Sequence, residues 1–225
     1  MDRVGVIIPV YYHSGHLAEV IAGVAQTLPR EQILVVDDGS PEASALIAEA
    51  LGIQVIRHER NRGKGAALRT GFRFWREHGM EWALTLDGDG QHDPGDIPSL
   101  LEAAREGGAD LIIGSRMADL TTMPPDRRFS NRTTSSLLSL LTGRKIEDSQ
   151  CGFRLVRLSL LEGVRFREEG FAFESEMILR LSRRGARLRF VPVHTVYDGR
   201  RSSSMRRFRD TLRFLRMVAV SGVER

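Results

Sequence analysis

Residues 81–94, EWALTLDGDGQHDP, place a short apolar run directly before a turn that contains Asp87, Asp89 and Asp93. The apolar run is typical of a buried β-strand, and Asp93 followed by Pro94 is typical of the start of a helix. A strand, an acidic turn and a helix in this order predict one unit of an α/β fold.

The same alternation continues along the chain. We expect strands, mostly apolar and therefore covered on both faces, at 4–10, 32–38, 53–58, 81–87, 109–115 and 187–193. We expect helices at 15–27, 41–51, 64–78, 94–106, 128–142 and 171–184. This pattern predicts the α/β class, with a mostly parallel sheet flanked by helices, in one domain over residues 1–200.

Composition and charge narrow the class of protein. The 225 residues are 41% hydrophobic and 28% charged, which is typical of a globular protein. The net charge of +4 combines +6 from residue 200 onward with −2 over the preceding residues, so we expect no nucleic-acid partner. The single Cys151 excludes an intrachain disulfide, and neither a signal peptide nor an apolar stretch of about 20 residues is visible, so we expect a cytoplasmic protein.

The acidic residues follow two strands of the expected sheet. Asp37 and Asp38 end the second strand and Asp87 ends the fourth, and ligands of open α/β sheets bind beyond the carboxyl ends of the strands. Residues at i and i+2 of an extended segment face one side, so Asp87 and Asp89 can present their oxygens to one ion. An open site of oxygen ligands suits Mg²⁺ or Mn²⁺, with a diphosphate completing the coordination shell.

Simpler interpretations of the acidic turn fit less well. An EF-hand loop starting at Asp87 requires Gly and Glu where this chain has His92 and Pro98. The GKGA stretch at 63–66 lacks the Ser or Thr of a P-loop. A helix cap explains Asp93, but it uses one carboxylate and leaves Asp87 with Asp89 unexplained.

Seven motifs follow one another in an order that resembles the family 2 glycosyltransferases of the GT-A fold. They are IIPVYY (7–12), VVDDGS (35–40), NRGKGAAL (61–68), LDGDGQHDP (86–94), IIGSR (112–116), DSQCGFRL (148–155) and GFAFESEMI (170–178). The resemblance covers about residues 4–200 and is strongest to the polyprenol-phosphate (dolichol-phosphate) sugar transferases. It implies a metal-dependent, inverting hexosyltransferase with Mg²⁺ or Mn²⁺ as cofactor. Its substrates would be a GDP- or UDP-linked sugar, with mannose favoured over glucose or N-acetylglucosamine, and a polyprenyl phosphate.

The resemblance also implies residues for the donor and the metal. The donor-binding residues would be Pro9, Tyr11, Asp37, Asp38, Lys64, Asp87, Gly88, Arg200 and Arg201. The Asp-x-Asp motif and the following glutamine supply Asp89 and Gln91 as metal ligands, with Asp87 near the ribose and the ion. Gly199 would let the loop that carries Arg200 and Arg201 close.

Several of these residues also have simpler interpretations. His92 is either part of the site or a packed core histidine, and Lys64 and Arg62 are either donor contacts or solvated charges at a helix start. The family often has Asn-Glu after the first-strand Tyr, whereas this chain has YYHSGH at 11–16, so the choice between GDP and UDP stays open.

On the acceptor side, the resemblance implies Arg116, Arg127 and Asn131 as ligands of the lipid phosphate, with Arg128 and Arg132 as neighbours. Asp87, Asp89 and Asp148 would be catalytic, and Glu174 or Glu176 would support the site. A phosphate acceptor is already anionic, with a second pKa of about 6, and needs no strong base. A hydroxyl acceptor would require Asp148 as the base.

Residues 201–225 form a basic amphipathic segment. Met205, Phe208, Leu212, Leu215 and Ala219 recur at spacings of three and four and make one apolar stripe among arginines. The stripe packs on the domain, or it binds peripherally to an anionic membrane at its cytoplasmic face.

Three other functions are alternatives to this one. A sugar-1-phosphate nucleotidyltransferase would have a glycine-rich loop after the first strand, which PVYYHSG is not. An RNA-binding module would carry basic residues over the body of the protein. A family 2 enzyme that glycosylates a hydroxyl group is the main alternative.

Overall fold

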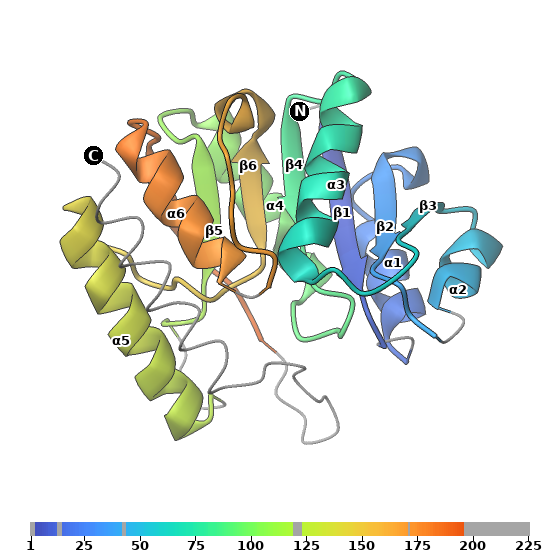
Figure 1. The fold of residues 1–225 in the computed structure, drawn as a ribbon, viewed down its shortest axis with the longest axis horizontal. Coiled ribbons are helices and arrows are strands. Elements are labelled where there is room, and N and C mark those ends of the chain that lie inside the picture. The colour runs from blue at the N-terminus through green and yellow to red at the C-terminus, as the bar shows by residue number, and fades with distance from the viewer. Residues whose placement is uncertain (1–2, 13–14, 42–43, 119–122, 171, 196–225) are drawn as a thin grey trace.

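The structure is a computed structural model that describes residues 3–12, 15–41, 44–118, 123–170 and 172–195 (Figure 1). The strands are β1 Val4–Val10, β2 Ile33–Asp37, β3 Gln54–Arg57, β4 Trp82–Thr85, β5 Leu111–Ser115, β6 Arg154–Arg157 and β7 Leu188–Pro192. The α-helices are α1 Leu17–Val24, α2 Ser44–Ala50, α3 Lys64–Glu77, α4 Ile97–Arg105, α5 Pro125–Thr142 and α6 Phe173–Arg183. Short 3-10 helices are η1 Arg30–Gln32, η2 Pro94–Asp96 and η3 Leu158–Leu161.

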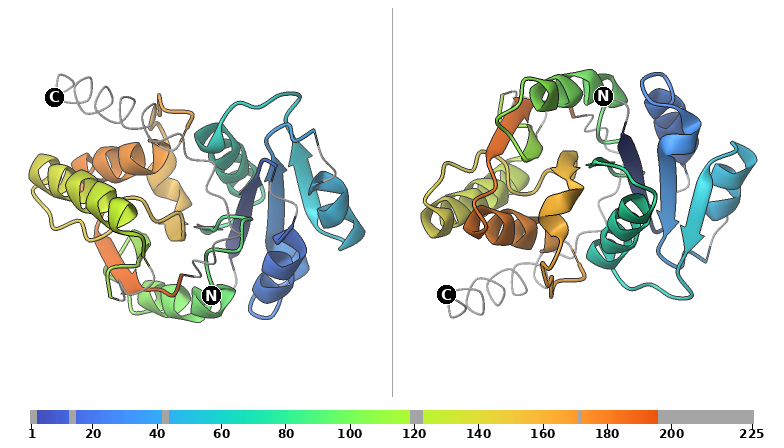
Figure 2. Two further views of the ribbon diagram at one scale, coloured as in Figure 1. Left: turned by 90° about the horizontal axis from the view of Figure 1, so that it is seen from below. Right: turned by 90° about the horizontal axis from the view of Figure 1, so that it is seen from above.

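Within the described ranges, the strands form one sheet in the order β3-β2-β1-β4-β6-β5-β7. The pairs among β1, β2, β3 and β4 are parallel, as is the pair β5 with β7. Figure 2 shows α3 and α6 on one face of the sheet and α1 and α4 on the other. The predicted α/β class, with a mostly parallel sheet covered on both faces, is confirmed.

The strand β6 was not among the predicted elements. It lies antiparallel between β4 and β5, with Trp82 opposite Arg157 and Ile113 opposite Arg154. Its four residues, RLVR, begin and end with arginine and give too short a pattern for periodicity to identify. Arg154 is nevertheless 1% exposed, so a charged side chain occupies a core position of the sheet.

Two helix starts differ from the prediction. The helix expected at 94–106 begins with the 3-10 turn η2, and α4 starts only at Ile97. The Asp93 carboxylate accepts a hydrogen bond of 2.8 Å from the backbone N–H of Gly95, so its predicted capping role is confirmed for that turn. Helix α5 starts at Pro125, before the expected 128, because proline fits the first helical position.

The parallel register brings the ends of three strands to one edge of the sheet. Val10 is paired with Asp37, and Ile7 with Thr85, so Asp87 follows β4 at the edge where β1 and β2 end. All three strands contribute residues to one continuous buried core. The tertiary structure therefore places the acidic residues along one edge of a well-packed sheet.

Candidate active site at the carboxyl edge of the sheet

The second acidic residue of the DDGS turn organises the loop before α3. One oxygen of the Asp38 carboxylate accepts the backbone N–H of Arg62 at 3.0 Å, and the other accepts that of Gly63 at 2.6 Å. The His58 Nδ1 lies 2.7 Å from the same carboxylate, and its Nε2 lies 3.0 Å from the Thr70 Oγ1. Asp38 is thus buried and engaged in holding the loop that leads to Lys64.

Asp37, the first acidic residue of the turn, holds the turn through contacts with Ser40 and Arg57. The Asp37 Oδ1 accepts the backbone N–H of Ser40 at 2.9 Å, and the Arg57 Nε lies 3.3 Å from its Oδ2. Arg57 also donates to the Ser40 carbonyl at 2.7 Å. Beside this turn lies a cavity of about 450 Å³, lined by Gly39, Ser40, Pro41, Arg57, His58 and Glu59.

A largely buried lysine bridges two carboxylates, those of Asp87 and Glu174. The Lys64 Nζ lies 2.6 Å from the Asp87 Oδ1 and 2.8 Å from the Glu174 Oε1. Burial would lower the pKa of the Lys64 ammonium, but the carboxylates of Asp87 and Glu174 raise it above its usual value. Lys64 is therefore a permanent cation inside the site, and the interpretation as a solvated charge is wrong.

Glycine at position 152 makes room for this charged group. A Cβ at Gly152 would lie 2.9 Å from the Lys64 Nζ and the Glu174 Oε1, and 3.0 Å from the Asp87 Oδ2. The Gly152 carbonyl accepts the hydroxyl of Thr85 at 2.7 Å, which fixes the backbone there. The three charged groups can meet only because the backbone beneath them carries no side chain.

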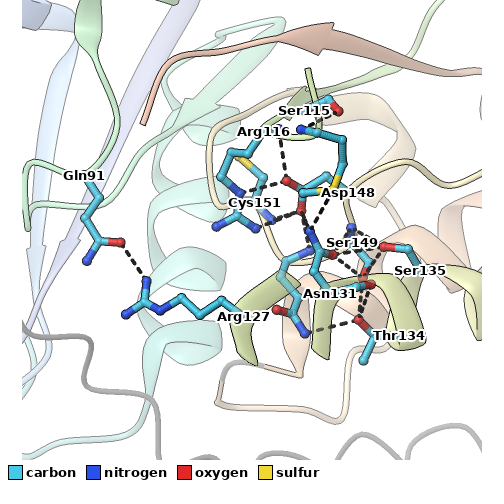
Figure 3. A network of polar contacts seen from close by, with 12 residues as sticks. Gln91, Ser115, Arg116, Arg127, Asn131, Thr134, Ser135, Asp148, Ser149 and Cys151 are labelled. Carbon is cyan, nitrogen blue, oxygen red and sulfur yellow. Dashed lines mark hydrogen bonds and ion pairs between the residues drawn. The ribbon is translucent and has the colours of Figure 1, made fainter. Parts of the chain in front are cut away.

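The second aspartate of the acidic turn lies next to Gln91. The Asp89 Oδ1 accepts the backbone N–H of Gln91 at 3.0 Å, and Arg127 donates to the Gln91 Oε1 at 3.2 Å (Figure 3). Asp89 is half-buried, whereas Asp87 is held by Lys64. In the described part of the chain, no three side chains of His, Cys, Asp or Glu gather as they would in a metal centre made by protein alone.

The oxygen atoms of the acidic turn fit a Mg²⁺ site whose remaining ligands come from the substrate. Mg²⁺ in proteins is usually held by one or two carboxylates together with phosphate oxygens of the substrate. Asp89 supplies a half-buried carboxylate of that kind, and Gln91, whose amide oxygen accepts from Arg127, lies buried beside it. The residues present therefore fit a divalent cation bound together with a diphosphate.

His92 lies in the core. It is 4% exposed and stacks on Phe153, with ring centroids 5.4 Å apart and planes inclined by 13°. Burial lowers the pKa of the His92 imidazole below its usual value, so the ring is neutral and its Nδ1 accepts the backbone N–H of Asp87 at 3.3 Å. The packed position that we considered from sequence is the observed one, and from it His92 orients the acidic turn.

A second buried network surrounds Asp148, which is 0% exposed (Figure 3). The Arg116 Nε donates to its Oδ2 at 2.7 Å and the Arg116 Nη2 to its Oδ1 at 2.8 Å. Asn131 adds a bond of 2.9 Å to Oδ1, and the backbone N–H groups of Gln150 and Cys151 add two more. Burial would raise the pKa of the Asp148 carboxyl, but Arg116 lowers it below its usual value.

Asn131 belongs to the interior of this network. Its side chain is 1% exposed, and its oxygen accepts from the Ser135 hydroxyl at 3.0 Å and from the backbone N–H of Ser149 at 3.3 Å. It is therefore buried, with its side chain bonded to Asp148, Ser135 and Ser149. Its contacts are those of a residue that fixes α5 against the Asp148 loop.

Arg154 is a buried residue of the site region that sequence reasoning missed. Its guanidinium donates to the carbonyls of Cys151 at 2.7 Å, Glu174 at 2.6 Å and Ser149 at 2.9 Å. It thereby joins the Asp148 loop to the start of α6, which carries Glu174. The arginine within the CGFR motif was the only available signal, and by itself it predicts a surface residue.

The remaining predicted residues fall into four groups. Pro9, Tyr11 and Gly88 lie at the carboxyl edge, and Arg128 and Arg132 lie on α5 beside Arg127. Glu176 is buried and binds the backbone N–H groups of Arg167 and Glu168, so it anchors that loop. Gly199, Arg200, Arg201 and the segment 201–225 lie outside the described residues.

Among the described residues, none of the helices combines the length and the apolar character that a membrane span requires.

Comparison with known proteins places these features in a wider group. Residues 5–165 match the family model described as Glycosyl transferase family 2. The chain is 31% identical to the undecaprenyl-phosphate mannosyltransferase of Micrococcus luteus, with 85% of this chain and 82% of that protein covered. It is 28% identical to a UDP-N-acetylglucosamine–dolichyl-phosphate N-acetylglucosaminyltransferase of Methanococcus voltae, with 85% and 84% covered.

A solved structure shares the fold. Glucosyl-3-phosphoglycerate synthase from Mycobacterium tuberculosis, crystallised with Mn²⁺, uridine diphosphate and phosphoglyceric acid, superposes with a TM-score of 0.75. The alignment covers 96% of this chain and 77% of that one at 17% identity. At that identity the similarity concerns the fold alone.

Proposed function

The chain belongs to glycosyl transferase family 2, as its motifs predicted, and from this premise we propose that it transfers a hexose from a nucleoside diphosphate sugar to a polyprenyl phosphate. Relatives of about 30% identity that carry this kind of activity in their names support the proposal. They use different sugars, so the proposal covers the class of reaction, with mannose as the first sugar to test.

The observation that carries the choice of acceptor is the state of Asp148. Both of its oxygens are occupied by Arg116, Asn131 and backbone N–H groups, and its pKa is lowered. Such a carboxylate is a poor base, because it is buried, already bonded and reluctant to take a proton. A hydroxyl acceptor needs a base, whereas a phosphate monoester, with a second pKa of about 6, attacks as an anion. The site therefore favours the phosphate.

On the acceptor side, we assign Arg116 and Arg127 to the phosphate of the lipid. The Arg116 guanidinium is held at two nitrogens by Asp148, which fixes its orientation. A planar guanidinium of fixed orientation suits recognition of a phosphate oxyanion. Asn131 and Asp148 then act as positioning residues for Arg116, in place of the acceptor-binding and catalytic roles that the sequence predicted.

On the donor side, we assign the diphosphate to the region of Lys64, Asp89 and Gln91. A divalent cation, Mg²⁺ or Mn²⁺, bound by Asp89 and Gln91 would supply Lewis-acid stabilisation of the charge on the leaving diphosphate. Lys64 adds a second cation whose charge is fixed by Asp87 and Glu174. Pro9, Tyr11 and the cavity beside Ser40 would receive the nucleoside, and the buried Asp37 and Asp38 would position the turn that lines this cavity.

In the proposed reaction an oxygen of the acceptor phosphate attacks the anomeric carbon in line with the diphosphate. One carbon–oxygen bond forms and the bond to the nucleoside diphosphate breaks, so the configuration inverts. No proton has to be removed from the acceptor.

A lipid substrate requires the enzyme to work at a membrane surface. We propose that residues 201–225 hold the enzyme peripherally at the cytoplasmic face of an anionic membrane, with residues 1–200 as the catalytic domain. The net charge of +6 from residue 200 onward supports this proposal, since each basic residue near an anionic surface contributes about 1 kcal/mol.

A panel of nucleoside diphosphate sugars tests the function. GDP- and UDP-linked mannose, glucose and N-acetylglucosamine are offered with a short polyprenyl phosphate and with the matching polyprenol, in Mg²⁺ or Mn²⁺. We expect transfer to the phosphate alone, stopped by a metal chelator. Transfer to the alcohol with none to the phosphate would refute the assigned acceptor.

A further inference from the structure

Helix α5 presents large apolar side chains to the outside of the molecule. Phe129 is 75% exposed and Leu140 is 80% exposed, the highest fractions among the large hydrophobic residues that the structure describes. Thr133 and Ser136 lie between them at spacings of four, three and four, so all of these residues share one face. The two intervening residues are exposed and short. Phe129 and Leu140 therefore project furthest from this face, about three helical turns and 16 Å apart.

The opposite face of the same helix accounts for its place in the fold. Asn131, Ser135 and Leu138 are buried there, and α5 packs against α6 at one flank of the molecule (Figure 1). A helix that packs through one face normally carries polar residues on the other. Single exposed apolar side chains are common on protein surfaces. Two large ones on the outward face of one helix form an apolar stripe that one partner can cover.

The charge around this stripe indicates the kind of partner. Residues 124–145 contain five basic residues and one acidic residue. Of the basic ones, Arg132, Arg144 and Lys145 are exposed. Exposed aromatic and aliphatic side chains among basic residues are typical of a helix that lies in the interface of an anionic membrane. The composition of the helix surface thus complements an anionic lipid bilayer.

The position of α5 connects the stripe to the proposed acceptor. Arg127, assigned above to the lipid phosphate, lies in the first turn of α5, and its guanidinium donates to the Gln91 Oε1 at 3.2 Å (Figure 3). Phe129 follows two positions later and therefore points to the other side of the helix. A helix is about 10 Å thick. A polyprenyl chain whose phosphate lies at Arg127 can therefore pass the N-terminal end of α5 and enter a bilayer on the Phe129 side.

We propose that the outward face of α5, with Phe129 and Leu140 inserted, docks on the surface of an anionic phospholipid bilayer. The inference rests on the proposed function, which supplies a lipid acceptor. It adds a second membrane contact to the one proposed for residues 201–225. A basic segment attracts the protein to the membrane from a distance, whereas two inserted side chains fix which side of the protein faces the lipid. Docking through α5 holds the acceptor side of the site at the membrane.

The test compares the double variant Phe129→Gln/Leu140→Gln with the wild type in the full chain. Leu46→Gln is the matched control, since Leu46 is 62% exposed on α2, at the opposite end of the molecule (Figure 1). Glutamine is a good helix former, so both changes keep the helices. Binding to vesicles of phosphatidylcholine and phosphatidylglycerol is measured by sedimentation. The double variant should bind at least about tenfold more weakly, because two buried apolar side chains are lost. The control should bind as the wild type does.

Transfer assays separate membrane docking from support of the site. With a long-chain polyprenyl phosphate embedded in the vesicles, kcat/KM of the double variant should fall about tenfold, in line with the loss of binding. With a short-chain polyprenyl phosphate in solution, kcat/KM should equal that of the wild type. The melting temperature should also be unchanged, because substitutions of exposed residues have little effect on stability.

Several results would overturn the inference. Vesicle binding that is unchanged in the double variant, or equally weakened in Leu46→Gln, would show that α5 is not the docking face. A lower melting temperature, or an equal loss of transfer to the short-chain acceptor, would show that these side chains support the fold. A wild-type dimer that becomes a monomer in the double variant, seen by analytical ultracentrifugation, would assign the stripe to a second copy of the chain. Transfer to neither acceptor by the wild type would refute the proposed function, and vesicle binding would still decide the role of α5.

Discussion

Replacing Asp148 with asparagine separates the two roles that this residue can have. The change keeps the shape and the bond from Asn131 but removes the negative charge that Arg116 contacts at 2.7 and 2.8 Å. The Arg116 side chain is 12% exposed, so it would be left largely buried without its counterion. Breaking a buried pair costs about 3–5 kcal/mol. With about 2–4 °C per kcal/mol for a domain of this size, the melting temperature should fall by at least about 6 °C.

The stability difference should depend on pH in one direction. The folded pKa of Asp148 lies below its unfolded value, so the carboxylate stabilises the fold above the unfolded pKa, about 3.9. That stabilisation is lost as the pH falls through the folded pKa. The wild type should therefore have a higher free energy of unfolding than the Asp148→Asn variant at neutral pH. This difference in stability should become smaller as the pH falls below about 4.

The effect on catalysis follows from the proposed positioning of Arg116. Misorienting one charged hydrogen bond, worth about 1.5–3 kcal/mol, should lower kcat/KM for the polyprenyl phosphate by about 10- to 150-fold. The KM for the donor should stay unchanged. The assay is steady-state transfer between pH 5 and 9, with each substrate varied in turn.

The pH profile decides between positioning and base catalysis. If the acceptor phosphate attacks as an anion, kcat/KM should fall on the acidic side near the second pKa of the phosphate, about 6, in both the wild type and the variant. The variant should then have the lower kcat/KM at every pH. If Asp148 is the base, the acidic limb of the wild type disappears in the variant. That second result would refute the reasoning and favour a hydroxyl acceptor. Asp110→Asn is the matched control, since Asp110 is paired with Arg187 away from the carboxyl edge and should leave transfer unchanged.

Four further predictions concern other parts of the site. Asp89→Asn should lower the rate of transfer by orders of magnitude and weaken Mn²⁺ binding in the presence of nucleotide, while the melting temperature stays unchanged. If the variant is as active as the wild type at saturating Mg²⁺, Asp89 is not a ligand of the metal. Arg127→Ala should raise the KM for polyprenyl phosphate about tenfold or more with little change in donor affinity, whereas equal loss of donor affinity in calorimetry would reassign this arginine. Gly152→Ala places a methyl group 2.9 Å from the Lys64 Nζ and should reduce kcat while costing about 1–3 kcal/mol of stability in denaturant unfolding. Full activity would show that the bridged carboxylates are not needed. Deleting 205–225 should abolish sedimentation with anionic liposomes and spare donor binding, and equal sedimentation with neutral vesicles would leave this segment a packing role.

The sequence by itself determined the architecture and the edge of the sheet where the site lies. Apolar runs alternating with helical patterns predicted the parallel sheet, and the strand ends predicted that Asp37, Asp38 and Asp87 share one crevice. Both predictions rest on local patterns and on the geometry of parallel strands, which a single sequence displays. The capping role of Asp93 was predicted in the same way, because caps act within a few residues.

Only the tertiary structure decided which charged groups are paired. Lys64 meets Glu174 across 110 positions of sequence, and Arg116 meets Asp148 across 32, and no periodicity encodes such pairs. Arg154 and the strand β6 escaped prediction because the buried arginine depends on two carbonyls of the preceding segment and on the Glu174 carbonyl of α6, which only folding brings together. A carboxylate acts as a base, a metal ligand or a positioning group according to its burial and its partners, and folding sets both.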